Sequence, residues 1–127
     1  MYNTLVNREE FEALVAEALD SLPEEFASKL DNVDVTVEAW PTMEQLRTSG
    51  VGPGRTLFGL YQGVPQTKRI NYHSVLPDKI TIFAGPILSA FGEKVEAVRD
   101  QVRKTVIHEI GHHFGMSEEA IRRAQSK

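Results

Sequence analysis

The segment HEIGHHFG, residues 108–115, holds three of the four histidines of this 127-residue chain. His108 and His112 are four residues apart, so on a helix they lie one turn apart on one face and can bind the same metal ion. Glu109 follows the first histidine, and in an H-E-x-x-H helix this glutamate is the general base for a zinc-bound water. The pattern predicts a zinc-dependent metallopeptidase in which His108 and His112 are metal ligands and Glu109 is catalytic.

A catalytic zinc site needs a third protein ligand besides the two histidines. Gly115 can take a left-handed conformation and turn the chain back, and Glu118 lies three residues beyond it. The spacing H-E-x-x-H-x-x-G-x-x-E matches the metzincin-like layout, with glutamate in the last position. We therefore expect Glu118 to be the third ligand. Glu119 is the alternative, because either acidic residue suits the first turn after a serine cap.

The motif differs from that of standard metzincins, which carry a methionine turn well downstream of the ligands. Here Met116 lies inside the motif, and only nine residues follow Glu118. Two histidines and one carboxylate can also hold Fe(II) as a facial triad. A single H-E-x-x-H helix favours zinc, so the expected cofactor is one Zn²⁺ per chain.

One long helix, expected over about residues 93–114, must present these side chains. Opposite the histidines, apolar residues recur at helical spacing: Val95, Val98, Val102, Val106 and Ile110. His113 points into this stripe, so we expect a core histidine there and not a ligand. Thr105 and Gln101 lie on the histidine face, one and two turns earlier, and are expected to line the cleft.

The other elements follow from periodicity and capping signals. Asn7 and Glu10 have the spacing of a capping box at the start of a helix. Helices are expected over 8–21, 23–30, 42–47 and 118–125, and strands over 32–40, 56–64 and 79–85. Strands crowd the middle of the chain and helices the ends, which predicts the α+β class and one domain over residues 1–127.

The strand at 56–64 contains two glycines, which favour a sheet edge where another backbone can approach. A peptide or protein substrate is expected to lie extended along this edge by β-augmentation. A second donor for the tetrahedral oxyanion is usually needed, and Tyr61, Tyr72 and His73 are the candidates.

Composition excludes several other classes of function. The net charge is −4 without a basic stripe, so we expect no nucleic-acid partner. No apolar run is long enough to cross a membrane. Cysteine is absent, which removes disulfides and thiolate ligands, and the first fifteen residues lack the features of a secretory signal. The expected location is cytoplasmic.

The chain resembles the small bacterial zincin-like metallopeptidases, predicted zinc-dependent proteases with a minimal metalloprotease-like domain. LFGLYQGVPQTKR (57–69), LPDKITIFAGPI (76–87) and VRKTVIHEIGHHFGMSEE (102–119) carry the resemblance. It implies a minimal zincin-like fold, in which helices flank a small mixed β-sheet and the active-site helix lies near the C-terminus. It also implies ligands at His108, His112 and Glu118, where the family commonly has aspartate at the last position, and catalysis by Glu109.

Two other interpretations stay open. The chain can be a zincin-like protein that binds metal without cleaving peptides, because few residues remain to build substrate subsites. It can also be a binding module in which the motif is coincidental. Mutation of Glu109 separates enzyme from metal-binding protein, and metal content separates both from a metal-free module.

Overall fold

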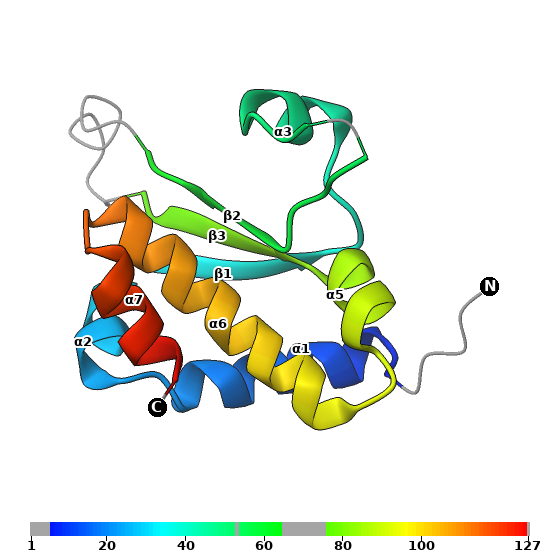
Figure 1. Ribbon diagram of the computed structural model, residues 1–127, viewed down its shortest axis with the longest axis horizontal. Helices are drawn as coiled ribbons and strands as arrows, with labels where there is room; N and C mark the ends of the chain where they lie inside the picture. The colour runs from blue at the N-terminus through cyan, green and yellow to red at the C-terminus, as the bar shows by residue number, and fades with distance from the viewer. Residues whose placement is uncertain (1–5, 53, 65–75, 127) are drawn as a thin grey trace.

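The computed structural model describes residues 6–52, 54–64 and 76–126. Its elements are, in chain order, α1 (Arg8–Asp20), α2 (Glu24–Ala27), the 3-10 turn η1 (Ser28–Leu30), β1 (Val33–Glu38), α3 (Met43–Thr48), β2 (Gly59–Gln62), β3 (Asp78–Phe83), α5 (Ala84–Phe91), α6 (Val95–His113) and α7 (Glu118–Gln125). Figure 1 shows the strands together and the helices around them, which confirms the α+β class.

The strands form a small mixed sheet in the order β1-β3-β2. β1 pairs with β3 in parallel, and β2 pairs with β3 in antiparallel orientation, with Tyr61 opposite Ile80 and Gly59 opposite Ile82. β2 is therefore an edge strand, as its glycines indicated. It is shorter than the expected strand at 56–64, and Gly63 lies beyond its end.

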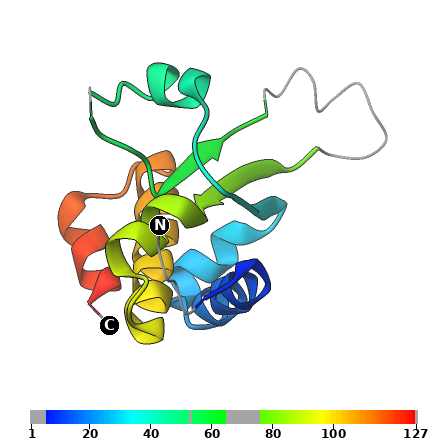
Figure 2. The same ribbon diagram turned by 90° about the vertical axis from the view of Figure 1, so that its right-hand side faces the viewer.

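The hydrophobic core lies between the sheet and the helices α1 and α6. Helix α6 crosses one face of the sheet with α1 and α7 beside it, while α3 lies on the opposite side (Figures 1 and 2). The apolar stripe of α6 is buried as expected at Val98, Val102, Val106 and Ile110. Ile80 and Ile82 of β3 pack against it with no exposed surface. None of the described helices has the length and hydrophobicity needed to cross a membrane.

The strand expected over 79–85 is wrong at its end, because β3 stops at Phe83 and α5 begins at Ala84. Sequence periodicity missed this helix, which contains Gly85 and Pro86. Pro86 is its third residue, where the missing N–H has no partner inside the helix, so proline is tolerated there. A Cβ on Gly85 would lie 2.3 Å from Trp40, so glycine allows α5 to begin close to the end of β1.

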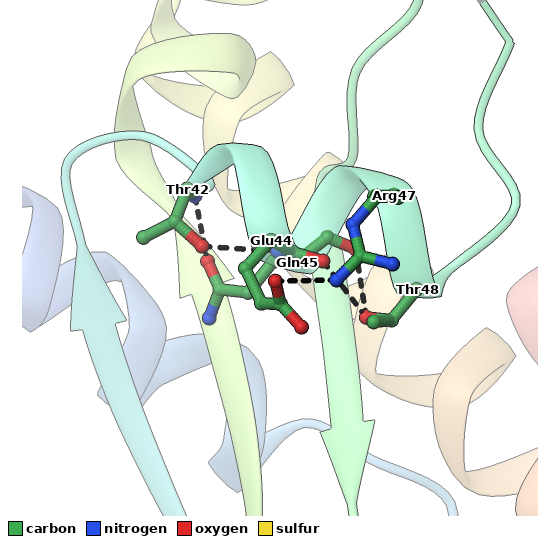
Figure 3. Close-up of polar contacts among 5 residues, drawn as sticks. All are labelled: Thr42, Glu44, Gln45, Arg47 and Thr48. Atoms are coloured by element: carbon green, nitrogen blue, oxygen red, sulfur yellow. Dashed lines mark hydrogen bonds and ion pairs between the residues drawn. The ribbon is translucent and has the colours of Figure 1, made fainter.

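Side chains cap the starts of two helices, one of them as predicted from the sequence. Asn7 and Glu10 form the expected capping box, with Glu10 N–H donating to Asn7 Oδ1 at 2.8 Å. Thr42 and Gln45 make a second box at α3, with Gln45 N–H donating to Thr42 Oγ1 at 3.0 Å (Figure 3). The Thr48 hydroxyl donates to the Glu44 carbonyl oxygen at 3.0 Å and closes the other end of α3 (Figure 3). Both ends of this short helix are thus fixed by side chains.

Candidate functional site

His108 and His112 lie next to each other on the exposed side of α6. Their ring centroids are 4.3 Å apart and the ring planes are inclined by 56°. Ile107 and Ile110 occupy the opposite side of the same turn and are fully buried. The four-residue spacing therefore brings both imidazoles to one place on the surface, as predicted.

Glu118 reaches this pair of histidines from α7. Its Oε2 lies 3.0 Å from His112 Nε2. Glu119 instead forms an ion pair with Arg123 at 3.0 Å, on the surface of its own helix. The hydroxyl of Ser117 caps α7 by accepting from the Ala120 N–H at 3.1 Å, so neither glutamate is needed as the cap. Of the two acidic candidates, the structure brings Glu118 to the histidines.

The turn between α6 and α7 depends on Gly115, whose φ of 72° is in the left-handed region. Met116 N–H donates to the Gly111 carbonyl oxygen at 2.8 Å, and Gly115 N–H donates to that of His112 at 3.2 Å. These two bonds form a Schellman motif, which pairs the last carbonyls of a helix and reverses the chain. The glycine expected to turn the chain back does so.

Helix α7 is held against α6 at both ends. Near Glu118, a Cβ on Gly111 would lie 2.5 Å from Ile121 Cγ1, so the glycine allows α7 to approach closely. At the far end, the buried Arg103 donates to the Gln125 carbonyl oxygen at 3.3 Å. Gln125 Nε2 donates in turn to the Lys104 carbonyl oxygen at 3.0 Å. These contacts fix the position from which Glu118 extends.

Two imidazoles and a carboxylate are donors that zinc accepts. Their side chains do not surround one point, and within the described part of the chain no group of three or more histidine and carboxylate side chains is arranged to hold a metal. His112 and Glu118 are instead paired directly with each other. Both side chains are at least half exposed, so rotation about their side-chain bonds is unobstructed by the core. The donor chemistry fits zinc, and the present side-chain conformations do not enclose it.

The Glu109 side chain contacts the edge strand β2. Its Oε1 accepts a hydrogen bond from the Tyr61 N–H at 3.1 Å. Burial raises the pKa of the Glu109 carboxyl, while the Tyr61 bond and the nearby His112 oppose this shift. Burial also lowers the pKa of His108, and the adjacent His112 acts in the same direction. Both shifts favour the neutral imidazole and the protonated carboxyl over their charged forms.

Two clefts meet at Glu109. One has a volume of about 360 Å³ and is lined by residues of β2, α6 and α7, among them Gln101, Thr105, His108 and Glu109. Gln101 and Thr105 line the cleft as expected, and Gln101 Nε2 donates to Thr105 Oγ1 at 3.1 Å. The other, of about 460 Å³, lies between β2 and the end of α3 and is lined by Tyr61 and Thr48. Glu109 thus borders open space on two sides.

Gly59 permits a close contact, although not the one expected. A Cβ at this position would lie 2.5 Å from Thr105 Cγ2. The glycine therefore brings β2 close to α6 of the same chain, and it is not explained by the approach of a substrate backbone. A Cβ on Gly63 would make only ordinary contacts at 3.7 Å.

The expectation of a core histidine at His113 is wrong. Its side chain is 39% exposed and its ring stacks on Tyr61, with centroids 3.8 Å apart and an interplanar angle of 16°. His113 is the last residue of α6, and there the helix has passed the buried part of the sheet. The Tyr61 hydroxyl, a candidate donor to the oxyanion, instead donates to Asp78 Oδ2 at 2.6 Å. Tyr72 and His73 lie outside the described residues.

Asp78 is a site residue that sequence reasoning missed. Its side chain is 13% exposed and accepts from Tyr61 and, at 2.9 Å, from the Val64 N–H. The signal in the sequence was weak, since Asp78 is one acidic residue before an apolar strand. The pairing of β2 with β3 brings it to Tyr61, and the packing of α6 on the sheet brings it to His113.

Comparison with known proteins agrees with this architecture. Among solved structures, a conserved hypothetical protein from Thermo thermophilus is similar, with a TM-score of 0.54 and 27% sequence identity. The similarity covers 92% of this chain and 99% of the other. No protein with a curated description matches significantly. The family model for zincin-like metallopeptidases matches residues 30–127. With the helix motif and the mixed sheet, this match over most of the chain shows that the protein belongs to the zincin-like metallopeptidase family.

Proposed function

We propose that the protein is a zinc metallopeptidase that binds one Zn²⁺ through His108, His112 and Glu118 and uses Glu109 as general base. Family membership supports metallopeptidase-related or metal-binding function in general. The observation that carries the finer proposal is the 3.0 Å contact between His112 Nε2 and Glu118 Oε2, beside the ring of His108. The substrate would be a peptide or protein, in the cytoplasm as the sequence suggests.

The residues around Glu109 suit a general base. When bound, zinc would polarise the scissile carbonyl and lower the pKa of its water. Glu109 would accept a proton from the attacking water and pass it to the leaving amine. Burial raises the pKa of its carboxyl, which brings a carboxylate closer to the working range of a general base. The Tyr61 N–H fixes one oxygen, so the carboxylate has a defined orientation.

The second candidate is a zinc-binding protein that does not hydrolyse peptides. The size of the clefts beside Glu109 favours it, because volumes of about 360 and 460 Å³ offer limited room for a long peptide. The His112–Glu118 contact does not separate the two candidates, since both bind zinc through these side chains. In this case, zinc binds with the same ligands but Glu109 has no role in turnover.

The first test is zinc content, measured by mass spectrometry of metals after dialysis against zinc. Wild type is expected to hold about one zinc per chain, and His112→Ala far less. Glu118→Gln and Glu119→Gln form a matched pair, because both remove one charge from the first turn of α7. Loss of zinc only in Glu118→Gln supports the proposed ligand set. Equal zinc in the two variants would exclude Glu118 as a ligand.

Turnover is tested on the same preparations with a peptide library analysed by mass spectrometry. Glu109→Gln is expected to keep its zinc and lose cleavage by at least about a hundredfold, the range of general acid–base catalysis. Cleavage by wild type and not by Glu109→Gln supports the enzyme. Zinc binding without cleavage by wild type would favour the second candidate.

A further inference from the structure

The N–H of Tyr61 points away from the sheet. Phe83 N–H donates to the Phe58 carbonyl oxygen at 2.9 Å, so these two residues form a hydrogen-bonded pair of the antiparallel ladder. Such pairs alternate along two antiparallel strands. Given the register, Leu60 also faces β3 with its N–H, whereas Tyr61 directs its N–H to the open edge of β2. Glu109 is the group that accepts it there.

Three separate contacts fix Tyr61 in this position. Its N–H binds Glu109, its ring stacks on His113, and its hydroxyl donates to Asp78. Glu109 and His113 are four residues apart on α6, so both face β2 from the same side of the helix. Tyr61 therefore contacts α6 at two successive turns and β3 at its first residue.

Asp78 is the centre of this arrangement. It lies two residues before Ile80, the partner of Tyr61, and diagonal neighbours of this kind lie within reach of an aromatic side chain. Besides the Tyr61 hydroxyl it accepts from the Val64 N–H, just after β2. His113 Nε2 lies 3.9 Å from its Oδ2. One largely buried carboxylate thus joins the end of β2, the start of β3 and the end of α6.

We propose that Asp78, Tyr61 and His113 form a clamp that positions the Glu109 carboxylate through the Tyr61 N–H. They are positioning residues and not catalytic ones, because none of them needs to touch the substrate. Release of the clamp would leave the fold and the zinc ligands in place but allow the Tyr61 N–H to move away from Glu109. The expected effect on catalysis rests on the proposed function, whereas the expected movement of the Tyr61 N–H does not.

The geometric test is amide hydrogen exchange by NMR on the full chain loaded with zinc. The Leu60 amide is an internal control, since it faces β3 and is exposed only when the strands separate. In Asp78→Ala and Tyr61→Phe, we expect the Tyr61 amide to exchange at least about tenfold faster relative to Leu60. Glu109→Ala removes the acceptor of the Tyr61 N–H. It should therefore raise the exchange rate of the Tyr61 amide relative to that of Leu60 by the same factor. Asp34→Asn, an exposed aspartate of β1, is the matched control and should change neither amide.

The catalytic test compares kcat and KM for a cleaved peptide. We expect Asp78→Ala and Tyr61→Phe to lower kcat by about 10–100-fold, the cost of a misplaced catalytic group, with KM changed less than twofold and zinc unchanged. Equal acceleration of the Tyr61 and Leu60 amides would overturn the clamp in favour of general sheet stability. An unchanged Tyr61 amide, or an unchanged kcat, would overturn it as well. A changed amide ratio in a protein without peptidase activity would support the clamp and reject the proposed function.

Discussion

Substitution of Gly111 by alanine tests whether the packing of α7 on α6 determines zinc affinity. Gly111 lies between Glu109 and His112, and a Cβ there would be 2.5 Å from Ile121 Cγ1 and 2.7 Å from its Cδ1. Ordinary contact begins at 3.4 Å, so Ile121 must retreat by about 0.9 Å, which is 3.4 minus 2.5. Glu118 lies one turn before Ile121 on the same helix, so its carboxylate would move with α7.

Two opposing energies determine the stability of Gly111→Ala. Overpacking a buried contact costs about 1–3 kcal/mol. Replacing glycine by alanine inside a helix gains about 1 kcal/mol. The net loss in free energy of unfolding should be only about 0–2 kcal/mol. Zinc affinity should fall further, by about 10–100-fold, the usual effect of disturbing the residues that orient a ligand.

Thermal unfolding of metal-free protein and competition with a fluorescent zinc chelator measure the two effects separately. Gly52→Ala is the control, because a Cβ there meets no atom within 4 Å. Ile121→Ala removes both clashing atoms, so in the double variant the penalty of Gly111→Ala on zinc affinity should largely disappear. Undiminished zinc affinity in Gly111→Ala, with Glu118→Gln weakened in the same assay, would refute the role of this contact.

Three other predictions concern the stability of the fold. Gly59→Ala should cost about 1–3 kcal/mol of unfolding free energy, because the new Cβ meets Thr105 Cγ2 at 2.5 Å; Thr105→Ser removes that methyl and should restore most of the loss in urea unfolding. Asn7→Ala should cost about 1 kcal/mol by removing the cap of α1, and equal urea midpoints for variant and wild type would contradict the capping argument. Burial raises the pKa of Glu109 above its ordinary 4.5, so the folded protein holds this proton more tightly than the unfolded chain. The resulting stability is present below pH 4.5 and is lost as the pH rises through the folded pKa. Metal-free Glu109→Gln should therefore match the Tm of wild type near pH 4 and exceed it at neutral pH, and a constant Tm difference across this range would contradict the assignment.

Local rules were sufficient for the helix that carries the histidines. The spacing of His108 and His112 determines that they share a face, and the periodic valines determine which face is buried. The cap at Asn7 and the turn at Gly115 also follow from residue type, because each depends on neighbours within a few residues. Glu118 could be proposed from spacing, but only the packing of α7 on α6 separates it from Glu119.

Contacts between distant segments could not be predicted in this way. A helical wheel shows the direction in which His113 points but not where the core ends along the helix. Its partners Tyr61 and Asp78 meet only through the register of β2 on β3. Helix α5 was missed for a different reason, since Pro86 suggests a break unless its position in the first turn is known.

The hydrogen bond from Tyr61 to Glu109 has a consequence for how a peptide can bind to the edge strand. Along β2, the residues whose N–H and C=O groups hydrogen-bond to β3 alternate with residues whose groups do not. Gly59 and Tyr61 are of the second kind, so their backbone N–H and C=O groups face the open edge of the sheet. While Glu109 accepts the Tyr61 N–H, a peptide carbonyl cannot use that donor. With fewer main-chain bonds available, more of the affinity would have to come from side chains in the two clefts. A ligand that occupied the Tyr61 N–H would compete directly with the proposed general base, which makes this single amide a point where a peptide could bind and inhibit at the same time.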